Sequence, residues 1–502
     1  MTSIGSLVEL GRRELRRGDH HEEAYADPVS ADHVASGETV ASGRPLASAR
    51  RLILPLALAQ FICSFAGSNM NVMITDISSD LDTTVKGVQT AITLFLLIMA
   101  ILMIPCSKLT DRWGRKRCFT WGLTLYGIGA LLSAVSPNLG VLILGNSVFE
   151  GVGTALLIPP VYILATLWFS DMTSRAWAFG VISGLGGIGA AAGPLIGGII
   201  TTGISWRAAF VFQALVVATI VLLSRRMVDP LAPDPTRPFD AVGAILSGIG
   251  MFFVVFGILQ AGSNNALFIL FLVIGGLFLL AFFFYIRRRE RAGKEVLLST
   301  GLFKNRTCNL ALVTQNIQWL LLMGVSFVVS VFLQEVRGYS AIKTGVIFTA
   351  ATLGILFSSL AAERLAKRYA QRTLIVAGFV MTLVGIVLLL AFVRASSDSV
   401  LAFVPGLALV GLGLGAMLTP SVNVVQSSFP EALQGEISGL SRSISNLGSS
   451  FGTAIAGTIL VSVVALGTRS YAVAMLVLVV LGLIGLGAAA LLPAKLEPAQ
   501  ER

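Results

Sequence analysis

The chain has 502 residues, of which 55% are hydrophobic and only 12% are charged, and its mean hydropathy is +0.84. A soluble protein of this length needs more charge to cover its surface, so a soluble globular fold is excluded. The net charge of +10 does not indicate a nucleic-acid partner, because the basic residues form short clusters between apolar runs. We therefore predict a protein that is surrounded by membrane lipid.

The N-terminal stretch, residues 1–51, is polar and rich in arginine. It lacks the short apolar region of a signal peptide, so we expect a cytoplasmic tail. Within it, "SIGSLVELGRRELRR" has the pattern of a short amphipathic helix on the membrane surface, and a frayed tail is the alternative.

Beyond this tail, apolar runs of about 20 residues recur, which is the length that crosses a bilayer core about 30 Å thick. Backbone groups in lipid must be paired within their own segment, so these runs are expected to be helices. The sequence predicts an all-α polytopic membrane protein with about fourteen spans, at 52–74, 88–107, 118–136, 141–164, 176–201, 207–224, 239–261, 266–286, 308–333, 343–361, 373–394, 400–424, 437–465 and 470–492.

The distribution of lysine and arginine predicts the orientation of these spans. An even number of spans places both termini on one side of the membrane. If that side is the cytoplasm, few basic residues fall outside it: Lys86, Arg207, Arg337, Lys343, Arg394 and Arg469. The positive-inside rule therefore predicts a multi-pass protein of the inner or plasma membrane with both termini in the cytoplasm.

The segment "LTDRWGRKR", 109–117, gathers charge around one glycine between the second and third spans. It resembles the loop between helices two and three of the major facilitator superfamily, whose pattern is Gly-x-Leu-x-Asp-Arg-x-Gly-Arg-Arg/Lys. Ser107 stands at the first glycine, and the matching residues are Leu109, Asp111, Arg112, Gly114, Arg115, Lys116 and Arg117. Asp111 can accept from a guanidinium or a helix N-terminus, and Gly114 permits a tight turn. The resemblance implies a conformational lock between two halves on the cytoplasmic side, without a role in substrate binding.

The fifth predicted span contains "GVISGLGGIGAAAGPLIGG", 180–198. It is similar to the antiporter motif of the same superfamily, Gly-x8-Gly-x3-Gly-Pro-x2-Gly-Gly, and it matches at Gly180, Gly189, Gly193, Pro194, Gly197 and Gly198. Gly189, Gly193 and Gly197 are four residues apart, so they line one helix face that another helix can approach closely. Pro194 favours a bend. In the family the motif marks exporters, where it is thought to seal or hinge the path between the halves.

Three further segments, "SWRAAF" (205–210), "LFKNRT" (302–307) and "GYSAIKTGV" (338–346), look like the fourteen-helix drug:proton antiporter family. The resemblance extends from about residue 50 to 492. It implies a major facilitator fold with two six-helix halves and an inserted helix pair. The expected parts are an N-terminal tail (1–51), an N-terminal half (52–226), the inserted pair with its cytoplasmic loops (227–300), a C-terminal half (301–492) and a cytoplasmic tail (493–502).

The chain departs from the family pattern at its charged positions. Ala66 stands where helix one usually carries Asp, and Ser147 and Glu150 replace the Arg and Gln of helix four. Glu150 is the only acid well inside a predicted span, where a carboxylate is costly and usually faces a cavity or a partner. It is the first candidate for proton coupling or substrate contact; a protonated side chain that only hydrogen-bonds a neighbouring helix is the alternative. Asp76, at the outer rim of helix one, is the second coupling candidate.

Polar and aromatic residues at membrane depth are candidates for the substrate cavity, although interhelical hydrogen bonds explain them equally well. They are Asn69, Asn71, Gln213, Gln315, Gln318, Trp319, Asn423, Gln426 and Arg442. Arg442 lies early in the thirteenth span, where it either faces the cytoplasmic cavity or extends to the interface.

The chain lacks the phosphate-binding loop Gly-x4-Gly-Lys-Ser/Thr and any catalytic or metal-ligand constellation, so we expect no enzyme activity, cofactor or metal. Its four cysteines are expected to be small apolar packing residues. We predict a monomeric transporter whose partners are a small molecule, protons and membrane lipid. It would export small hydrophobic compounds, such as drugs, antibiotics or natural products, by proton-driven alternating access. A metabolite facilitator or importer and a transport-inactive membrane sensor are the alternatives.

Overall fold

The computed structural model describes residues 46–169, 172–236, 238–261, 264–366, 368–395, 399–429, 434–462 and 469–494. The amphipathic stretch that was expected in the N-terminal tail and the C-terminal residues 495–502 lie outside these ranges. Within them all regular structure is helical, which confirms the predicted fold class.

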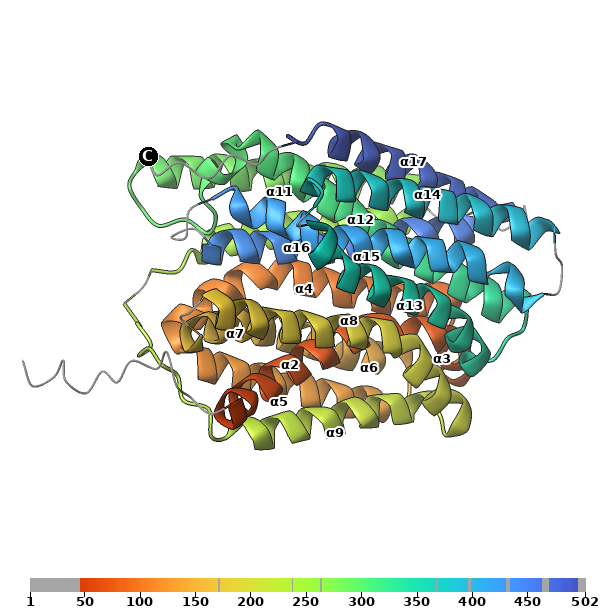
Figure 1. The fold of residues 1–502 in the computed structure, drawn as a ribbon, viewed down its shortest axis with the longest axis horizontal. Coiled ribbons are helices and arrows are strands. Elements are labelled where there is room, and N and C mark those ends of the chain that lie inside the picture. The colour runs from red at the N-terminus through yellow and green to blue at the C-terminus, as the bar shows by residue number, and fades with distance from the viewer. Residues whose placement is uncertain are drawn as a thin grey trace, which may run out of the picture. The chain divides into compact units, whose positions relative to one another are not determined.

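The first set of helices covers the predicted N-terminal half, and we call α2–α9 by that name (Figure 1). Its elements are α2 (Leu46–Asn69), η1 (Met70–Val72), α3 (Ile74–Asp80), α4 (Val85–Trp113), α5 (Arg115–Ala134), α6 (Leu139–Leu142), η2 (Ile143–Glu150), α7 (Gly151–Trp168), α8 (Met172–Gly203) and α9 (Trp206–Ser224). The first span, Leu52–Val72, combines α2 with the 3-10 turn η1, after which the chain continues into α3. The fourth span contains a π-helical segment, η2, which ends at Glu150.

The inserted pair consists of α10 (Ala241–Gln260) and α11 (Asn265–Arg291). We call α12–α17 the C-terminal half. Its elements, with the turn that precedes them, are η3 (Thr300–Lys304), α12 (Arg306–Val331), η4 (Phe332–Val336), α13 (Ala341–Ala366), α14 (Gln371–Ala395), η5 (Val400–Ala402), α15 (Val404–Ser427), α16 (Gln434–Ser462) and α17 (Arg469–Ala490).

Each of the fourteen predicted spans coincides with a helix. By length and hydropathy, eleven spans in the described ranges can cross a membrane, or twelve if the bent pair Gly184–Ala190 and Ala192–Gly203 counts as one. The other two, α5 and α16, are more polar, since α5 begins with three basic residues and α16 is rich in serine. Many of the α16 serines are buried within the bundle, where they can bond to neighbouring helices.

Polar residues at the helix starts explain where several spans begin. Thr84, Asn138, Ser205, Asp240 and Asn305 each cap the helix that follows by accepting from the backbone amide three residues later. Such caps satisfy a backbone donor that has no partner within the helix. The bend in α8 falls just before Pro194, whose ring removes a backbone hydrogen bond and clashes with the preceding turn.

The packing of the helices separates the two halves (Figure 1). In the N-terminal half, α2 packs on α8 and α9, and α5 packs on α7 and α9. In the C-terminal half, α15 packs on α13 and α14, and α12 packs on α16 and α17. Two helix pairs, α4 with α16 and α8 with α13, join the halves, and we call these contacts the seam.

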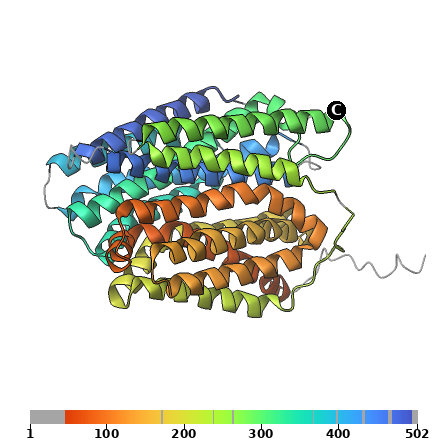
Figure 2. The same cartoon turned by 180° about the vertical axis from the view of Figure 1, so that it is seen from behind.

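The inserted pair lies beside the seam. Helix α10 packs on both α4 and α16, and α11 packs on α10, as Figure 2 shows for the green helices beside the orange α4. A small apolar core that includes Leu97, Val255 and Ala454 joins α4, α10 and α16. The α10 helix therefore contacts both halves, whereas the outer surface of α11 is almost entirely exposed for contact with lipid.

Candidate functional site

The charged loop after α4 is held by its own ion pair and by the segment that follows α9. Asp111 Oδ1 lies 2.6 Å from Arg115 Nη2. Asp229 Oδ2 accepts from the backbone amides of Arg115 at 2.6 Å and Lys116 at 3.3 Å. A carboxylate at this position satisfies the free amides at the start of α5 and interacts favourably with the helix dipole.

Gly114 is the turning point of this loop, with φ at +94°, a region that disfavours any residue with a Cβ. A Cβ added at Gly114 would lie 3.4 Å from Asp229 Oδ2, so the loop also approaches its partner closely. Arg117 is exposed and Arg112 is half-buried. Next to the motif, Lys108 Nζ contacts Glu436 Oε1 of α16 at 2.7 Å, which is a charged contact between the halves.

The glycines of α8 lie against two other helices. A Cβ at Gly189 would lie 2.3 Å from Phe61 O, and a Cβ at Gly193 would lie 2.0 Å from Ser68 Oγ. At Gly197 it would lie 3.1 Å from the Cβ of Asn69. These three glycines therefore permit the close packing of α8 on α2. Gly180 belongs to α8 as well, in its N-terminal part.

The end of the same motif lies against the C-terminal half. A Cβ at Gly198 would lie 2.5 Å from Ala341 O, and one at Gly345 would lie 2.3 Å from Pro194 O. The amide of Ile342 donates to Thr202 Oγ1 at 3.0 Å. The motif thus contacts α2 within its own half and α13 across the seam.

Glu150 is fully buried between helices of the N-terminal half. Its Oε1 accepts from Ser133 Oγ at 3.5 Å, and among the described residues its Oε2 has no hydrogen-bond partner. Nearby in the same half, the Tyr126 hydroxyl donates to Gln213 Oε1 at 2.5 Å and lies 3.4 Å from Ile62 O. No described lysine or arginine pairs with Glu150.

The second coupling candidate, Asp76, lies in the first turn of α3. Its side chain remains exposed, and partial desolvation raises the pKa of its carboxyl. On the same helix Asp80 pairs with Arg207, whose hydrogen bond lowers the pKa of the Asp80 carboxyl, and Trp206 Nε1 also donates to it at 3.0 Å. Asp76 and Glu150 therefore occupy different environments.

The structure distributes the predicted cavity residues over several places instead of one. Asn69 and Asn71 are buried near the end of α2, where Gln334 Nε2 of η4 donates to Asn71 O at 2.9 Å. Gln213 bonds to Tyr126 in the N-terminal half, and Gln315 accepts from Ser441 Oγ at 2.9 Å. The Gln213 and Gln315 contacts each lie within one half, whereas the Asn71 contact joins the two halves.

The remaining candidates belong to the C-terminal half. Gln318 Nε2 donates to Leu414 O at 3.4 Å, and Trp319 is half-buried on the same helix. On α15, Asn423 is exposed and Gln426 is half-buried.

Arg442 of α16 contacts Tyr162 of α7 in the opposite half, a contact that could not be predicted from the sequence. Its Nη2 donates to the Tyr162 hydroxyl of α7, and its guanidinium lies 4.8 Å from the centre of the Tyr162 ring. Tyr162 in turn donates to Gln60 Oε1 of α2 at 3.2 Å. Tyr162, Gln60 and Tyr126 were not among the residues predicted from the sequence. Tyrosine inside an apolar run was the available signal, since the whole chain has only seven.

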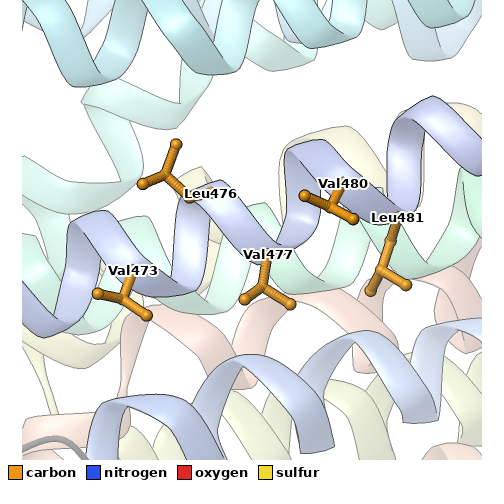
Figure 3. Close-up of a pocket in the computed structure, with 5 residues that line it drawn as sticks. All are labelled: Val473, Leu476, Val477, Val480 and Leu481. Carbon is orange, nitrogen blue, oxygen red and sulfur yellow. The ribbon is translucent and has the colours of Figure 1, made fainter.

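A concave surface on α17 is lined by apolar side chains alone. Figure 3 shows that its lining is aliphatic: Val473, Leu476, Val477, Val480 and Leu481. It offers no hydrogen-bond partner to a polar group and suits a lipid acyl chain. Within the described ranges, no three His, Cys, Asp or Glu side chains gather as a metal site requires. The four cysteines are buried and unpaired with one another.

Comparison with known proteins identifies the family. The profile of the Major Facilitator Superfamily matches residues 56–302, 239–453 and 311–501. The chain belongs to the Major Facilitator Superfamily. It is therefore a multi-pass membrane transporter and not an enzyme, as the sequence predicted.

Three relatives of this transporter illustrate the range of the family. The puromycin resistance protein pur8 of Streptomyces alboniger is 30% identical over 417 residues, 81% of each chain. The multidrug efflux pump LfrA of Mycolicibacterium smegmatis is 29% identical over 372 residues, 73% of this chain and 71% of the pump. The riboflavin transporter RibZ of Clostridioides difficile is 25% identical over 407 residues, 80% of this chain and 86% of that transporter.

A solved structure supports the fold. The crystal structure of a mutant of the peptide transporter POT in complex with alafosfalin superimposes with a TM-score of 0.66. The match covers 87% of this chain and 94% of the peptide transporter at 16% sequence identity. At this identity the similarity concerns the fold alone.

Proposed function

We propose that this transporter exports small, largely hydrophobic compounds, such as drugs, antibiotics or natural products, by proton-driven alternating access. The observation that carries the export direction is the antiporter motif of α8, which marks exporters in the family that it resembles. Its glycines lie against α2 in the same half and against α13 across the seam. The names of pur8 and LfrA, which denote resistance and multidrug efflux, support the same substrate class. The protein would act as a monomer in the plasma membrane, surrounded by lipid, with both termini in the cytoplasm.

Alternating access requires contacts between the halves that can break and form again. The seam contains such contacts. Between α4 and α16, Gln89 Nε2 donates to Thr453 O at 3.3 Å and Ser450 Oγ donates to Thr93 O at 3.1 Å. Gln89 Nε2 also donates to Ala454 O at 3.2 Å. All of these hydrogen bonds join α4 to α16, and each has a modest net strength in a membrane protein. Rocking of one half against the other would exchange them without disturbing the core of either half.

The charged loop would act as the lock that stabilises one of these states. In this structure Lys108 contacts Glu436 across the seam, and the loop is positioned by Asp229. Because Asp229 and Asp111 both bind Arg115, the loop is held in one orientation beside the ion pair that joins the halves. The predicted lock residues would therefore transmit a change at the cytoplasmic end of α4 to α16.

Glu150 would carry the proton. Its environment suits the neutral acid, because no described cation pairs with it and a buried unpaired carboxylate is costly. Its only hydrogen-bond partner among the described residues is Ser133 Oγ, at 3.5 Å from Oε1, and Oε2 has none. An ionised Glu150 would bury its charge with a single long hydrogen bond, whereas a protonated one would bury no charge.

The helix that carries Glu150 is also irregular, and this supports a functional role. The carboxyl lies at the end of the π-helical segment η2, and such segments occur frequently at functional sites. Close packing fixes the segment against α5: a Cβ at Gly129 would lie 2.6 Å from Gly145 O and 2.8 Å from Glu150 N. A small shift of α5 would therefore change the surroundings of Glu150.

Inside-out vesicles provide the test of this function. Vesicles with the full chain would be compared with vesicles lacking it, using puromycin and the dye ethidium as probes, with and without an acidic interior. Export predicts uptake of at least one probe that depends on the pH gradient and does not need ATP. Gradient-independent uptake that only equalises concentrations would instead favour the facilitator.

The similarity to the riboflavin transporter RibZ, which covers 80% of this chain, supports a second candidate function. That function is the import or facilitated diffusion of a metabolite. Right-side-out vesicles would distinguish it, since an importer would accumulate riboflavin in them and an exporter would not. Binding of a probe without transport in either orientation would indicate the transport-inactive sensor.

A further inference from the structure

We propose that Arg442, with Tyr162 and Gln60, forms a binding site for an anionic group, a carboxylate or an acidic phenol, on the transported compound. The proposal rests on the proposed export function, because it assigns a substrate class to the path between the halves. Its basis is a cation within the membrane-spanning bundle that contacts the opposite half and has only neutral partners among the described residues.

The position of Arg442 along the bundle follows from its neighbour. Ser443 Oγ donates to Ala100 O at 2.5 Å, and Ala100 lies near the middle of α4, which runs from Val85 to Trp113. At 1.5 Å per residue, Ala100 is about 20 Å from the Trp113 end of the helix. On its own helix Arg442 is eight residues, about 12 Å, from the start of α16 at Gln434, and its guanidinium contacts Tyr162 within the bundle.

The charge of Arg442 is not neutralised within the described chain. No carboxylate there lies within 4.0 Å of its guanidinium, and its contacts are the hydroxyl and the ring of Tyr162. A cation at membrane depth usually pairs with another group or faces a water-filled path. A neutral hydroxyl and a ring face position the cation, but they supply no opposite charge.

The geometry leaves Arg442 able to bind more than its present partners. A guanidinium has five N–H donors in a planar fork that matches a carboxylate, and the contact with Tyr162 is one hydrogen bond. The side chain is also only partly buried. A bound anion would replace or share the contact with Tyr162.

Both halves contribute to this arrangement. Arg442 comes from α16, whereas Tyr162 and Gln60 come from α7 and α2. Gln60 fixes the orientation of the Tyr162 hydroxyl, because that hydroxyl donates its proton to Gln60 Oε1. An anion on Arg442 would thus contact groups that move apart when the halves rock, so its binding would respond to the transport cycle. The depth argues against a lipid phosphate as the anion.

The test compares two probes that differ in charge but share one ring system, 1-pyrenebutyrate and 1-pyrenebutanol. The purified full chain would be placed in nanodiscs of phosphatidylcholine alone, so that no anionic lipid competes. Energy transfer from tryptophan to pyrene reports binding, after subtraction of the signal from empty nanodiscs. Neither a proton gradient nor transport is needed, so failure of the export function would not affect the result.

The proposal predicts that the chain binds the carboxylate about 10-fold to 100-fold more tightly than the alcohol, the range of a charge-assisted hydrogen bond. Arg442→Gln should abolish this preference and leave the affinity for the alcohol within about twofold. The control is Arg306→Gln, an exposed arginine at the start of α12, which should behave like the parent chain.

If Arg442→Gln does not fold, Arg442→Lys and Tyr162→Phe provide the same decision. Lysine keeps the charge without the planar fork, and phenylalanine removes the hydroxyl that orients the guanidinium, so each should lower the preference several-fold. Equal binding of both probes by the parent chain, or an undiminished preference for the carboxylate in these variants, would overturn the proposal.

Discussion

The substitution Gly189→Ala tests the packing of α8 on α2 with a single methyl group. The new Cβ would lie 2.3 Å from Phe61 O, whereas real Cβ contacts are at least 3.0 Å, so the helices must separate locally by 0.7 Å or more (3.0 − 2.3). Its next neighbours, Phe61 C at 3.0 Å and Phe61 Cα at 3.1 Å, are also backbone atoms, so no side-chain rotation relieves the clash. Overpacking of this kind costs about 1–3 kcal/mol.

Gly187 in the same helix is the matched control, because a Cβ there meets nothing within 4 Å. Gly187→Ala should be neutral or stabilise by up to about 1 kcal/mol, since alanine favours a helix more than glycine does. The assay is the midpoint of thermal unfolding of the purified protein in detergent at one fixed scan rate, together with efflux in cells.

Gly193→Ala supplies an internal check, because its Cβ would clash with a side-chain atom. It would lie 2.0 Å from Ser68 Oγ, and after Ser68→Ala the nearest atom of that residue would be its Cβ at 3.2 Å. The double variant should therefore recover most of the midpoint that Gly193→Ala loses, whereas Gly189→Ala has no such rescue. Equal midpoints and full efflux for Gly187→Ala and Gly189→Ala would refute the reasoning.

Two further predictions concern the charged loop after α4. Asp111→Asn weakens the ion pair with Arg115, and Gly114→Leu places a side chain at φ +94° beside Asp229. Both variants should reach the membrane but lose transport. Normal efflux by both would contradict the proposed lock. Asp229→Ala leaves the amides of Arg115 and Lys116 without their acceptor, so it should lower the free energy of unfolding by about 0.5–2 kcal/mol. Asp229→Asn should lower it by less. An unchanged unfolding midpoint in the alanine variant would contradict this role.

The helices and the family motifs could be predicted from the sequence because their signals are local. A run of about 20 apolar residues must form a helix in lipid, whatever its neighbours are. The spacing of Gly189, Gly193 and Gly197 likewise determines that they share a face of α8. The break of the first span at Asn69 was missed, since a 3-10 turn inside an apolar run changes the hydropathy very little.

The partners of the site residues could not be predicted, because they depend on tertiary packing. Asp229 binds an amide that is 114 positions earlier in the chain, and Arg442 binds a tyrosine 280 positions away. No spacing rule connects residues at such separations. The polar candidates also looked alike in the sequence, yet Gln213 bonds within its own half and Arg442 bonds to the opposite half.

Proton-driven export through Glu150 is the central claim, and Glu150→Gln in proteoliposomes tests it most directly. The measurement is the accumulation of a transported probe against its gradient, driven by an imposed pH difference, with downhill exchange of the same probe recorded in parallel. Glutamine keeps the shape of the side chain and cannot release a proton. We predict that the variant loses accumulation but keeps probe binding and exchange, and that the exposed control Asp82→Asn keeps all three. Accumulation by Glu150→Gln at the parental level, with unchanged pH dependence, would contradict the account.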